Sequence, residues 1–105
     1  MQNNFKGGIK MQIADIKPGT GNIDLKAEVV GIEAPRELEK YGKKLRVASV
    51  TLKDATGTIV LTLWNDEIDK VQEGNVIHIE NGYANTWQNK AQLTLGRQGK
   101  LTVLE

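Results

Sequence analysis

The stretch that decides the fold is DATGTIVLTLWNDEIDKVQEGN, residues 54–75. Its first four letters, DATG, predict a tight turn in which Gly57 is free to take a positive φ. Every second residue of the following TIVLTLWN is a large aliphatic one, namely Ile59, Leu61 and Leu63. That two-residue period predicts a strand over residues 58–65 with these three side chains facing inward.

A short helix is predicted directly after this strand. Ile68 and Val71 are three residues apart, which places them on one face of a helix. Asn65 or Asp66 suits its N-cap, and Gly74 suits its end. The whole segment is therefore expected to form a turn, a strand and one short helix.

Other segments with the two-residue period predict further strands over residues 22–34, 45–54, 75–84 and 91–97, with a last short strand or extension at 100–105. In NIDLKAEVVGIEA the alternation changes phase at Val30-Gly31-Ile32. A strand whose buried face switches at a glycine is bent or bulged, and it can serve two sheets around a corner.

Two segments between these strands are less regular. In the strand at 45–54, Leu45 and Val47 share one parity while Val50 and Leu52 share the other, which predicts an irregularity near residues 48–49. PRELEKYGKK, residues 35–44, is expected to form a charged loop, with or without a helical turn.

The segment before the first strand contains two apolar residues at helical spacing. In MQIADIKPGTGN, residues 11–22, Ile13 and Ile16 are three apart and precede Pro18 and Gly19. This predicts one helical turn or an extended arm that packs its isoleucines on the domain.

These elements together predict an all-β fold, a five-stranded OB-fold barrel with a short helix between strands three and four. The alternatives are an SH3-like barrel or another small β-domain. Residues 1–11 are expected to be a flexible leader, and residues 12–105 to form the domain. A chain of 105 residues is the size of a single domain.

Composition argues against several classes of protein. The chain has no cysteine, which excludes disulfides and thiolate metal sites, and no apolar run nears the roughly 20 residues that span a bilayer. We therefore expect a cytoplasmic protein. Its one histidine, His78, lies within a strand, and GTGN lacks the Lys-Ser or Lys-Thr of a phosphate loop. No catalytic residue, metal or cofactor is predicted.

Aromatic side chains are the strongest functional signal, because the chain contains only five. Trp64 has the parity opposite to the inward leucines, so it either covers the barrel mouth or forms a flat surface for stacking a base. Strict alternation points Tyr83 inward, but a bulge at Asn81-Gly82 would turn it outward. Trp87 falls in the expected turn between strands four and five. We predict that the three aromatics form one row, on adjacent strands three and four and the loop that follows.

Basic and amide side chains surround these aromatics in the sequence. The net charge is only +1, so a polyanion would need basic residues gathered on one face. Basic residues near the two expected binding loops are Arg36, Lys40, Lys43, Lys44, Arg46 and Lys90. Polar residues that can hydrogen-bond to base edges or backbone are Thr62, Asn85, Gln88, Gln92 and Thr94.

The combination of DATGTIVLTLW with VQEGNVIHIENGYANTWQNKAQLTLGRQGKL resembles the single-OB-fold single-stranded-DNA-binding proteins of archaea, which are related to replication protein A domains. The resemblance covers roughly residues 12–104. In that family a Trp closing strand three and two aromatics around strand four stack on successive bases, which implies these roles for Trp64, Tyr83 and Trp87. A basic residue of the loop between strands one and two is matched by Arg36. The flexible tail of many members has no counterpart before Glu105, so tail-based interactions are not carried over.

From the residues and the resemblance we expect a non-catalytic protein that binds and protects single-stranded DNA in replication, recombination and repair. Stacking accepts any base, so little sequence preference is expected. Two alternatives use the same surface. One is a single-stranded-RNA-binding OB module, and the other is a protein-interaction subunit of a replication complex, with repair or replication proteins as its partners.

Overall fold

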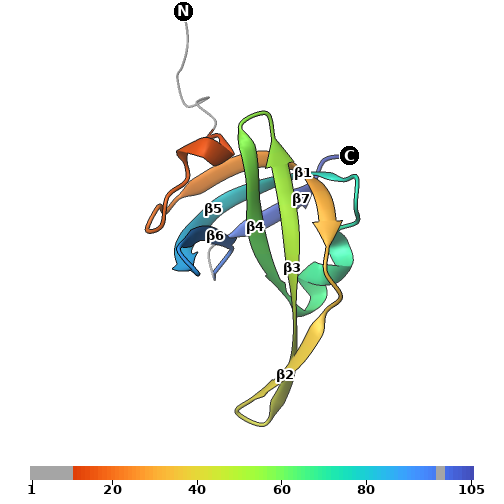
Figure 1. Ribbon diagram of the computed structural model, residues 1–105. Coiled ribbons are helices and arrows are strands. Elements are labelled where there is room, and N and C mark those ends of the chain that lie inside the picture. The colour runs from red at the N-terminus through yellow and green to blue at the C-terminus, as the bar shows by residue number, and fades with distance from the viewer. Residues whose placement is uncertain (1–10, 97–98) are drawn as a thin grey trace, which may run out of the picture.

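The computed structural model describes residues 11–96 and 99–105, so nearly all of the expected leader lies outside the described residues (Figure 1). The elements in chain order are η1 (Ile13–Asp15), β1 (Ile23–Ile32), β2 (Arg36–Lys40), β3 (Lys43–Asp54), β4 (Gly57–Trp64), η2 (Asn65–Lys70), β5 (Val76–Trp87), β6 (Lys90–Thr94) and β7 (Lys100–Val103). No helix in this part of the chain is long and apolar enough to cross a membrane.

Five of the strands form a closed ring. They pair in the order β1-β3-β4-β6-β5, and a further β1–β5 pairing closes the circle. The β4–β6 pair is parallel, while β2 and β7 extend the sheet beyond the ring. Burial of apolar side chains inside the ring drives the fold. The largest fully buried ones are Ile23, Leu25, Leu52, Leu61, Leu63, Ile77, Ile79 and Leu93.

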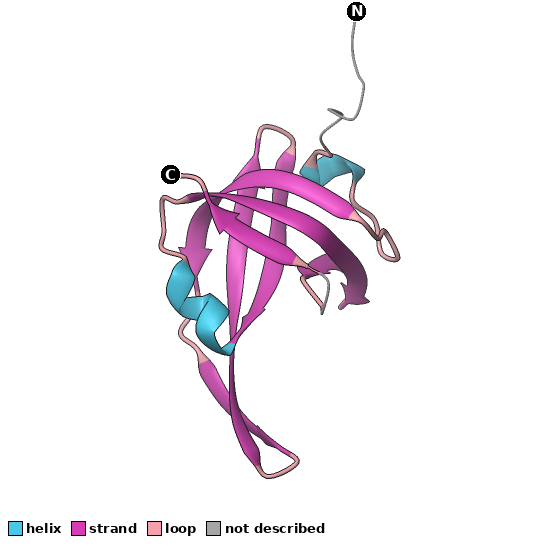
Figure 2. Cartoon of the chain, turned by 180° about the vertical axis from the view of Figure 1, so that it is seen from behind, coloured by secondary structure: helices cyan, strands magenta, loops and turns pink. Residues whose placement is uncertain are grey.

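The strand and helix expected from residues 54–75 are present, with one difference. Ile59, Leu61 and Leu63 face the core as predicted. The helix is only a six-residue 3-10 segment, η2, which ends well before Gly74. It lies next to the end of β4, on the side opposite to η1 (Figure 2).

The predicted bend in the first strand is confirmed. Residues 23–28 of β1 pair with β5, and residues 28–32 pair with β3. The register shifts between Val29 and Gly31, at the predicted change of phase. One strand thereby joins both sides of the ring.

The irregularity predicted near residues 48–49 is absent. β3 and β4 pair without interruption from Val47–Trp64 to Asp54–Gly57. The change of parity instead marks a change of partner, because the first half of β3 pairs with β2 and its second half with β1. Val47 is buried as well, but on the outer face of the ring, where it pairs with Trp64.

The charged loop predicted at residues 35–44 is wrong, because these residues form a strand and a hairpin. β2 pairs with residues 43–47 of β3, and the turn at Tyr41-Gly42 has positive φ at both residues, 51° and 76°. Such turns match the twist of a two-stranded hairpin. We call β2 with residues 43–47 the arm; it projects away from the ring (Figure 1).

The DATG turn also fastens the segment that precedes β1. Asp54 Oδ2 accepts a hydrogen bond from the Ile13 N–H at 2.8 Å, and Thr56 Oγ1 accepts one from Ala14 at 3.0 Å. Ile13 is buried as expected, and η1 is the single helical turn proposed for it. Partial burial alone would raise the pKa of Asp54, but hydrogen bonds from Thr56, Ile13 and Gly57 outweigh it and lower this pKa.

We expect Asp54→Ala to destabilise the fold at neutral pH by about 1–2 kcal/mol, because the Ile13 N–H and the turn lose their acceptor. A carboxyl with a lowered folded-state pKa stabilises above its unfolded-state pKa, and the effect disappears as the pH falls through the folded-state value. The difference from wild type should therefore shrink in acid. Urea unfolding at neutral and acidic pH measures it.

Glu73→Gln is the matched control, since it removes a carboxylate from an exposed position. An Asp54→Ala variant as stable as this control at neutral pH would contradict the role of Asp54.

Candidate nucleic-acid interface

A cleft of about 1040 Å³ lies on the outer face of the ring, between the arm and the β5–β6 hairpin. Its floor is formed by outward residues of β3 and β4. Of the predicted site residues, six line it: Arg36, Thr62, Trp64, Gln88, Lys90 and Gln92. Apolar lining residues that the sequence did not indicate as part of a site are Leu38, Val47 and Val60. Leu38 would have been identified had residues 35–44 been recognised as a strand, whereas Val60 shares the outward parity of Trp64.

Trp64 is the last residue of β4 and faces the cleft. It shares its parity with Val60 and Thr62, as predicted, and pairs with Val47 across the sheet. Directly after it the chain turns into η2 at Asn65, whose φ is 53°. The indole is therefore fixed at the junction of two elements, where it is partly exposed.

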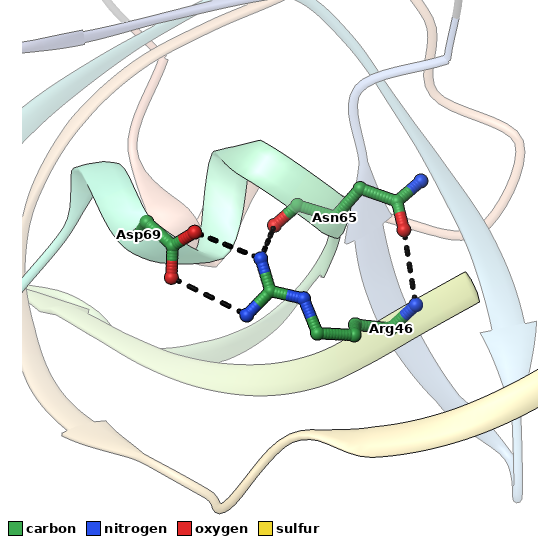
Figure 3. A network of polar contacts seen from close by, with 3 residues as sticks. All are labelled: Arg46, Asn65 and Asp69. Carbon is green, nitrogen blue, oxygen red and sulfur yellow. Dashed lines mark hydrogen bonds and ion pairs between the residues drawn. The ribbon is translucent and has the colours of Figure 1, made fainter. Parts of the chain in front are cut away.

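Arg46 braces this junction from the other face of β3 (Figure 3). Its guanidinium donates to Asp69 Oδ2 at 2.8 Å and to the Asn65 carbonyl at 3.1 Å, and its backbone N–H donates to Asn65 Oδ1. The hydrogen bond and the charge of Arg46 lower the pKa of Asp69, and the same pairing raises the pKa of Arg46. The predicted contact of Arg46 with a ligand does not fit this position, because the side chain points away from the cleft.

The arm has two chemically different faces. Paired residues of a hairpin lie on the same face, so Arg36 and Leu38, which line the cleft, share their face with Lys43. The opposite face carries Glu37, Glu39, Lys44 and Arg46. Lys43 and Lys44, predicted together as ligand contacts, are therefore separated: the first continues the wall of the cleft, and the second does not.

The hairpin on the other side of the cleft begins later than expected. Trp87 is the last residue of β5, paired with Lys90, and not part of the turn. The turn is Gln88-Asn89, with φ of 52° and 65°. Gln88 and Lys90 line the cleft, so this end supplies one amide and one cation to it.

Tyr83 points outward, because β5 carries a bulge. Ile79 and Gly82 both face the core, so two residues lie between inward positions where regular alternation has one. Asn81 takes up the irregularity with a φ of 56°. The predicted bulge at Asn81-Gly82 is confirmed, and 47% of Tyr83 is exposed.

Tyr83 is nevertheless not beside Trp64. The predicted adjacency of strands three and four is wrong, because β6 lies between β4 and β5. Tyr83 lines a separate hollow of about 470 Å³ with Gly21, Asn22 and Leu95.

A cross-strand row connects the hollow with the cleft. Thr62, Thr94 and Tyr83 pair in sequence across β4, β6 and β5, and Asn85 pairs with Gln92 one step along. The site is thus one outer face of three strands, with an aromatic residue at each side of it.

Comparison with known proteins places this chain in a family. The family described as "Single-stranded DNA binding protein Ssb-like, OB fold" matches residues 16–103, and the chain belongs to it. A curated relative, the single-stranded DNA binding protein Ssb of Saccharolobus solfataricus, is 23% identical over 90 residues. That match covers 86% of this chain and 61% of the relative, so this chain spans about three fifths of the relative's length.

Solved structures agree on the fold. The second OB-fold domain of replication protein A from Methanococcus maripaludis is 26% identical, with a TM-score of 0.74 over 92% of this chain and 96% of that one. A replication protein A heterotrimer bound to single-stranded DNA contains a chain that is 23% identical, with the same TM-score over 90% of this chain and 24% of that one. The OB-fold predicted from the sequence is thereby confirmed.

The bulge that orients Tyr83 can be tested by adding one methyl group. A Cβ on Gly82 would lie 3.0 Å from Ile79 Cγ2 and 3.3 Å from Leu93 Cδ1, so Gly82→Ala should destabilise the fold by about 1–3 kcal/mol through overpacking. The control is Gly21→Ala, whose Cβ would meet only Tyr83 Cδ1, at 3.8 Å. Urea unfolding of both variants decides the point, and equal stabilities would argue against a tight bulge.

Proposed function

We propose that this member of the Ssb-like OB-fold family binds single-stranded DNA across the outer face of β4, β6 and β5, without catalysis. The observation that carries the proposal is the position of Trp64, whose indole lies in a cleft with Arg36 on one wall and Lys90 on the other. A flat aromatic surface between two cations suits an unpaired base with its phosphates.

Stacking supplies the main attraction. Trp64 receives one base in the cleft, Tyr83 receives another at the hollow, and Trp87 a further one at the end of β5. Each stacked base contributes about 1–3 kcal/mol with little regard to its identity. Paired bases have no free face, so duplex DNA binds poorly.

Backbone and base edges are held by the polar residues around these aromatics. Arg36, Lys43 and Lys90 contact phosphates, because they lie on the walls of the cleft or continue them. Amides and hydroxyls contact base edges, from Thr62, Asn85, Gln88, Gln92 and Thr94. Lys44 and Arg46 are left out of this set, since they lie on the other face of the arm.

The biological role follows by analogy with the relatives. One relative is named a single-stranded DNA binding protein, and one structural neighbour is a heterotrimer bound to single-stranded DNA. We infer that this chain protects single-stranded DNA in replication, recombination and repair, where other proteins of these processes are its partners.

Removal of the indole should weaken binding most directly. We expect Trp64→Ala to raise the Kd for oligo-dT about 5- to 150-fold, the equivalent of one lost stacking contact. Trp64→Phe keeps an aromatic surface and should stay near wild type. Tryptophan fluorescence titration suits wild type, and fluorescence anisotropy of a labelled oligomer suits all variants.

A matched oligo-U separates DNA from RNA in the same assay. If Trp64→Ala binds oligo-dT as tightly as wild type does, the stacking model is wrong. If wild type binds oligo-U more tightly than oligo-dT, the ligand is RNA and not DNA.

The two faces of the arm give a second test. Lys43→Ala should weaken binding and lower the slope of log K against log salt by about 0.7, the value of one phosphate contact on a single strand. Lys44→Ala removes the same charge from the neighbouring residue and should leave that slope unchanged. Binding measured from low to high salt distinguishes the two variants. If both lower the slope equally, the arm acts only through its total charge.

A further inference from the structure

Away from the cleft and the hollow, the outer face of the ring carries a group of three metal-ligating side chains. They are Asp24 of β1 and His78 and Glu80 of β5, and one ligand atom of each lies within 4.8 Å of the other two. His78 Nε2 is 2.7 Å from Asp24 Oδ1. None of the three lines the surface assigned above to single-stranded DNA.

Strand alternation fixes two of these side chains. Ile77 and Ile79 are fully buried in the ring, so His78 and Glu80 point outward together. Their backbone is held on one edge by β1 and on the other by β7. Two ligands therefore lie on a strand that is paired on both sides.

The β5 bulge supplies the third. Residues 23–25 of β1 oppose residues 79–82 of β5, so Asp24 faces a stretch that is one residue longer than its own. Asp24 comes close to both His78 and Glu80 as a result. Its side chain is half exposed and that of His78 is 21% exposed, so the group is open to ions from solution.

We propose that Asp24, His78 and Glu80 bind one Zn²⁺ ion, with water in a fourth position. One imidazole nitrogen and two carboxylate oxygens are ligands that Zn²⁺ accepts, and three protein ligands with an open position form a known type of site. In a tetrahedral site with bonds of about 2.0–2.1 Å, ligand atoms are about 3.3 Å apart. In the structure the three ligand atoms lie within 4.8 Å of one another, so the side chains have to adjust around the ion when it binds.

Nearby charges set the conditions for binding. Lys26 pairs with His78 across the sheet and Lys100 pairs with Glu80, and in the described part of the chain neither lysine forms an ion pair with Asp24 or Glu80. The carboxylates of Asp24 and Glu80 are therefore not held in ion pairs by these two lysines.

Calorimetric titration of the tag-free full chain with Zn²⁺ tests the proposal. We expect one ion per chain, and at least about tenfold weaker binding for both His78→Ala and Glu80→Gln. Glu73→Gln, an exposed carboxylate elsewhere, is the control and should bind as wild type does. Co²⁺ should give visible absorption bands that disappear with His78→Ala.

Thermal unfolding keeps the test independent of folding defects. Zn²⁺ should raise the Tm of wild type and Glu73→Gln, and raise that of both site variants clearly less, while their metal-free Tm reports whether they fold. Wild type without Zn²⁺ heat or Co²⁺ bands would overturn the site. So would a folded His78→Ala variant that binds as tightly as wild type.

Discussion

Closure of the ring between β1 and β5 imposes the constraint on which the rest of the structure depends. β5 has to pair with β1 and β7 along its first half and with β6 along its second. A regular twelve-residue strand would keep one face toward the core throughout, and Tyr83 would then be buried among the leucines.

The bulge at Asn81-Gly82 resolves this conflict. It returns Gly82 to the inside, where an added Cβ would lie only 3.0 Å from Ile79 Cγ2, and it turns Tyr83 outward. The same extra residue gathers Asp24, His78 and Glu80 on the neighbouring part of the outer face.

The charged side chains of the arm are distributed over two faces, and this distribution matters more for binding than the net charge of the chain. The net charge of +1 gives no indication of a polyanion site. The two-residue alternation of the arm nevertheless places Arg36 and Lys43 with the cleft, and Glu37 with Glu39 on the reverse. Arg46 shows that a basic residue near a binding surface does not have to face it. It is a cation next to a binding surface, but its guanidinium is bound to Asp69 and to the Asn65 carbonyl, where it fixes the end of β4 behind Trp64.

Much of the fold was predictable because burial leaves a regular trace in a sequence. The alternation of Ile59, Leu61 and Leu63, and the change of phase at Gly31, correctly predicted a strand and a bend. The arm was missed for two reasons. RELEK contains only one apolar residue, so it shows no alternation of apolar and polar residues. Its turn, Tyr41-Gly42, is not one of the Asn-Gly or Asp-Gly pairs that indicate a hairpin in a sequence. The order of β4, β6 and β5 was also beyond prediction, since alternation says which face a residue takes but not which strand lies beside it. The face on which a side chain lies was therefore predicted more successfully than the arrangement of the strands that carry it.

The place of β6 between β4 and β5 has a mechanical consequence for any strand that reaches both aromatic positions. Two spacings of about 4.8 Å separate β4 from β5, so Trp64 and Tyr83 lie on strands about 10 Å apart. Stacked bases of one strand rise by only about 3.4 Å. In the proposed binding mode, bases held on Trp64 and Tyr83 therefore cannot be stacked directly on each other, and other bases of the strand lie between them. Such a binding mode would also oppose hairpins and other self-paired structures, because a paired base has no free face for either aromatic ring.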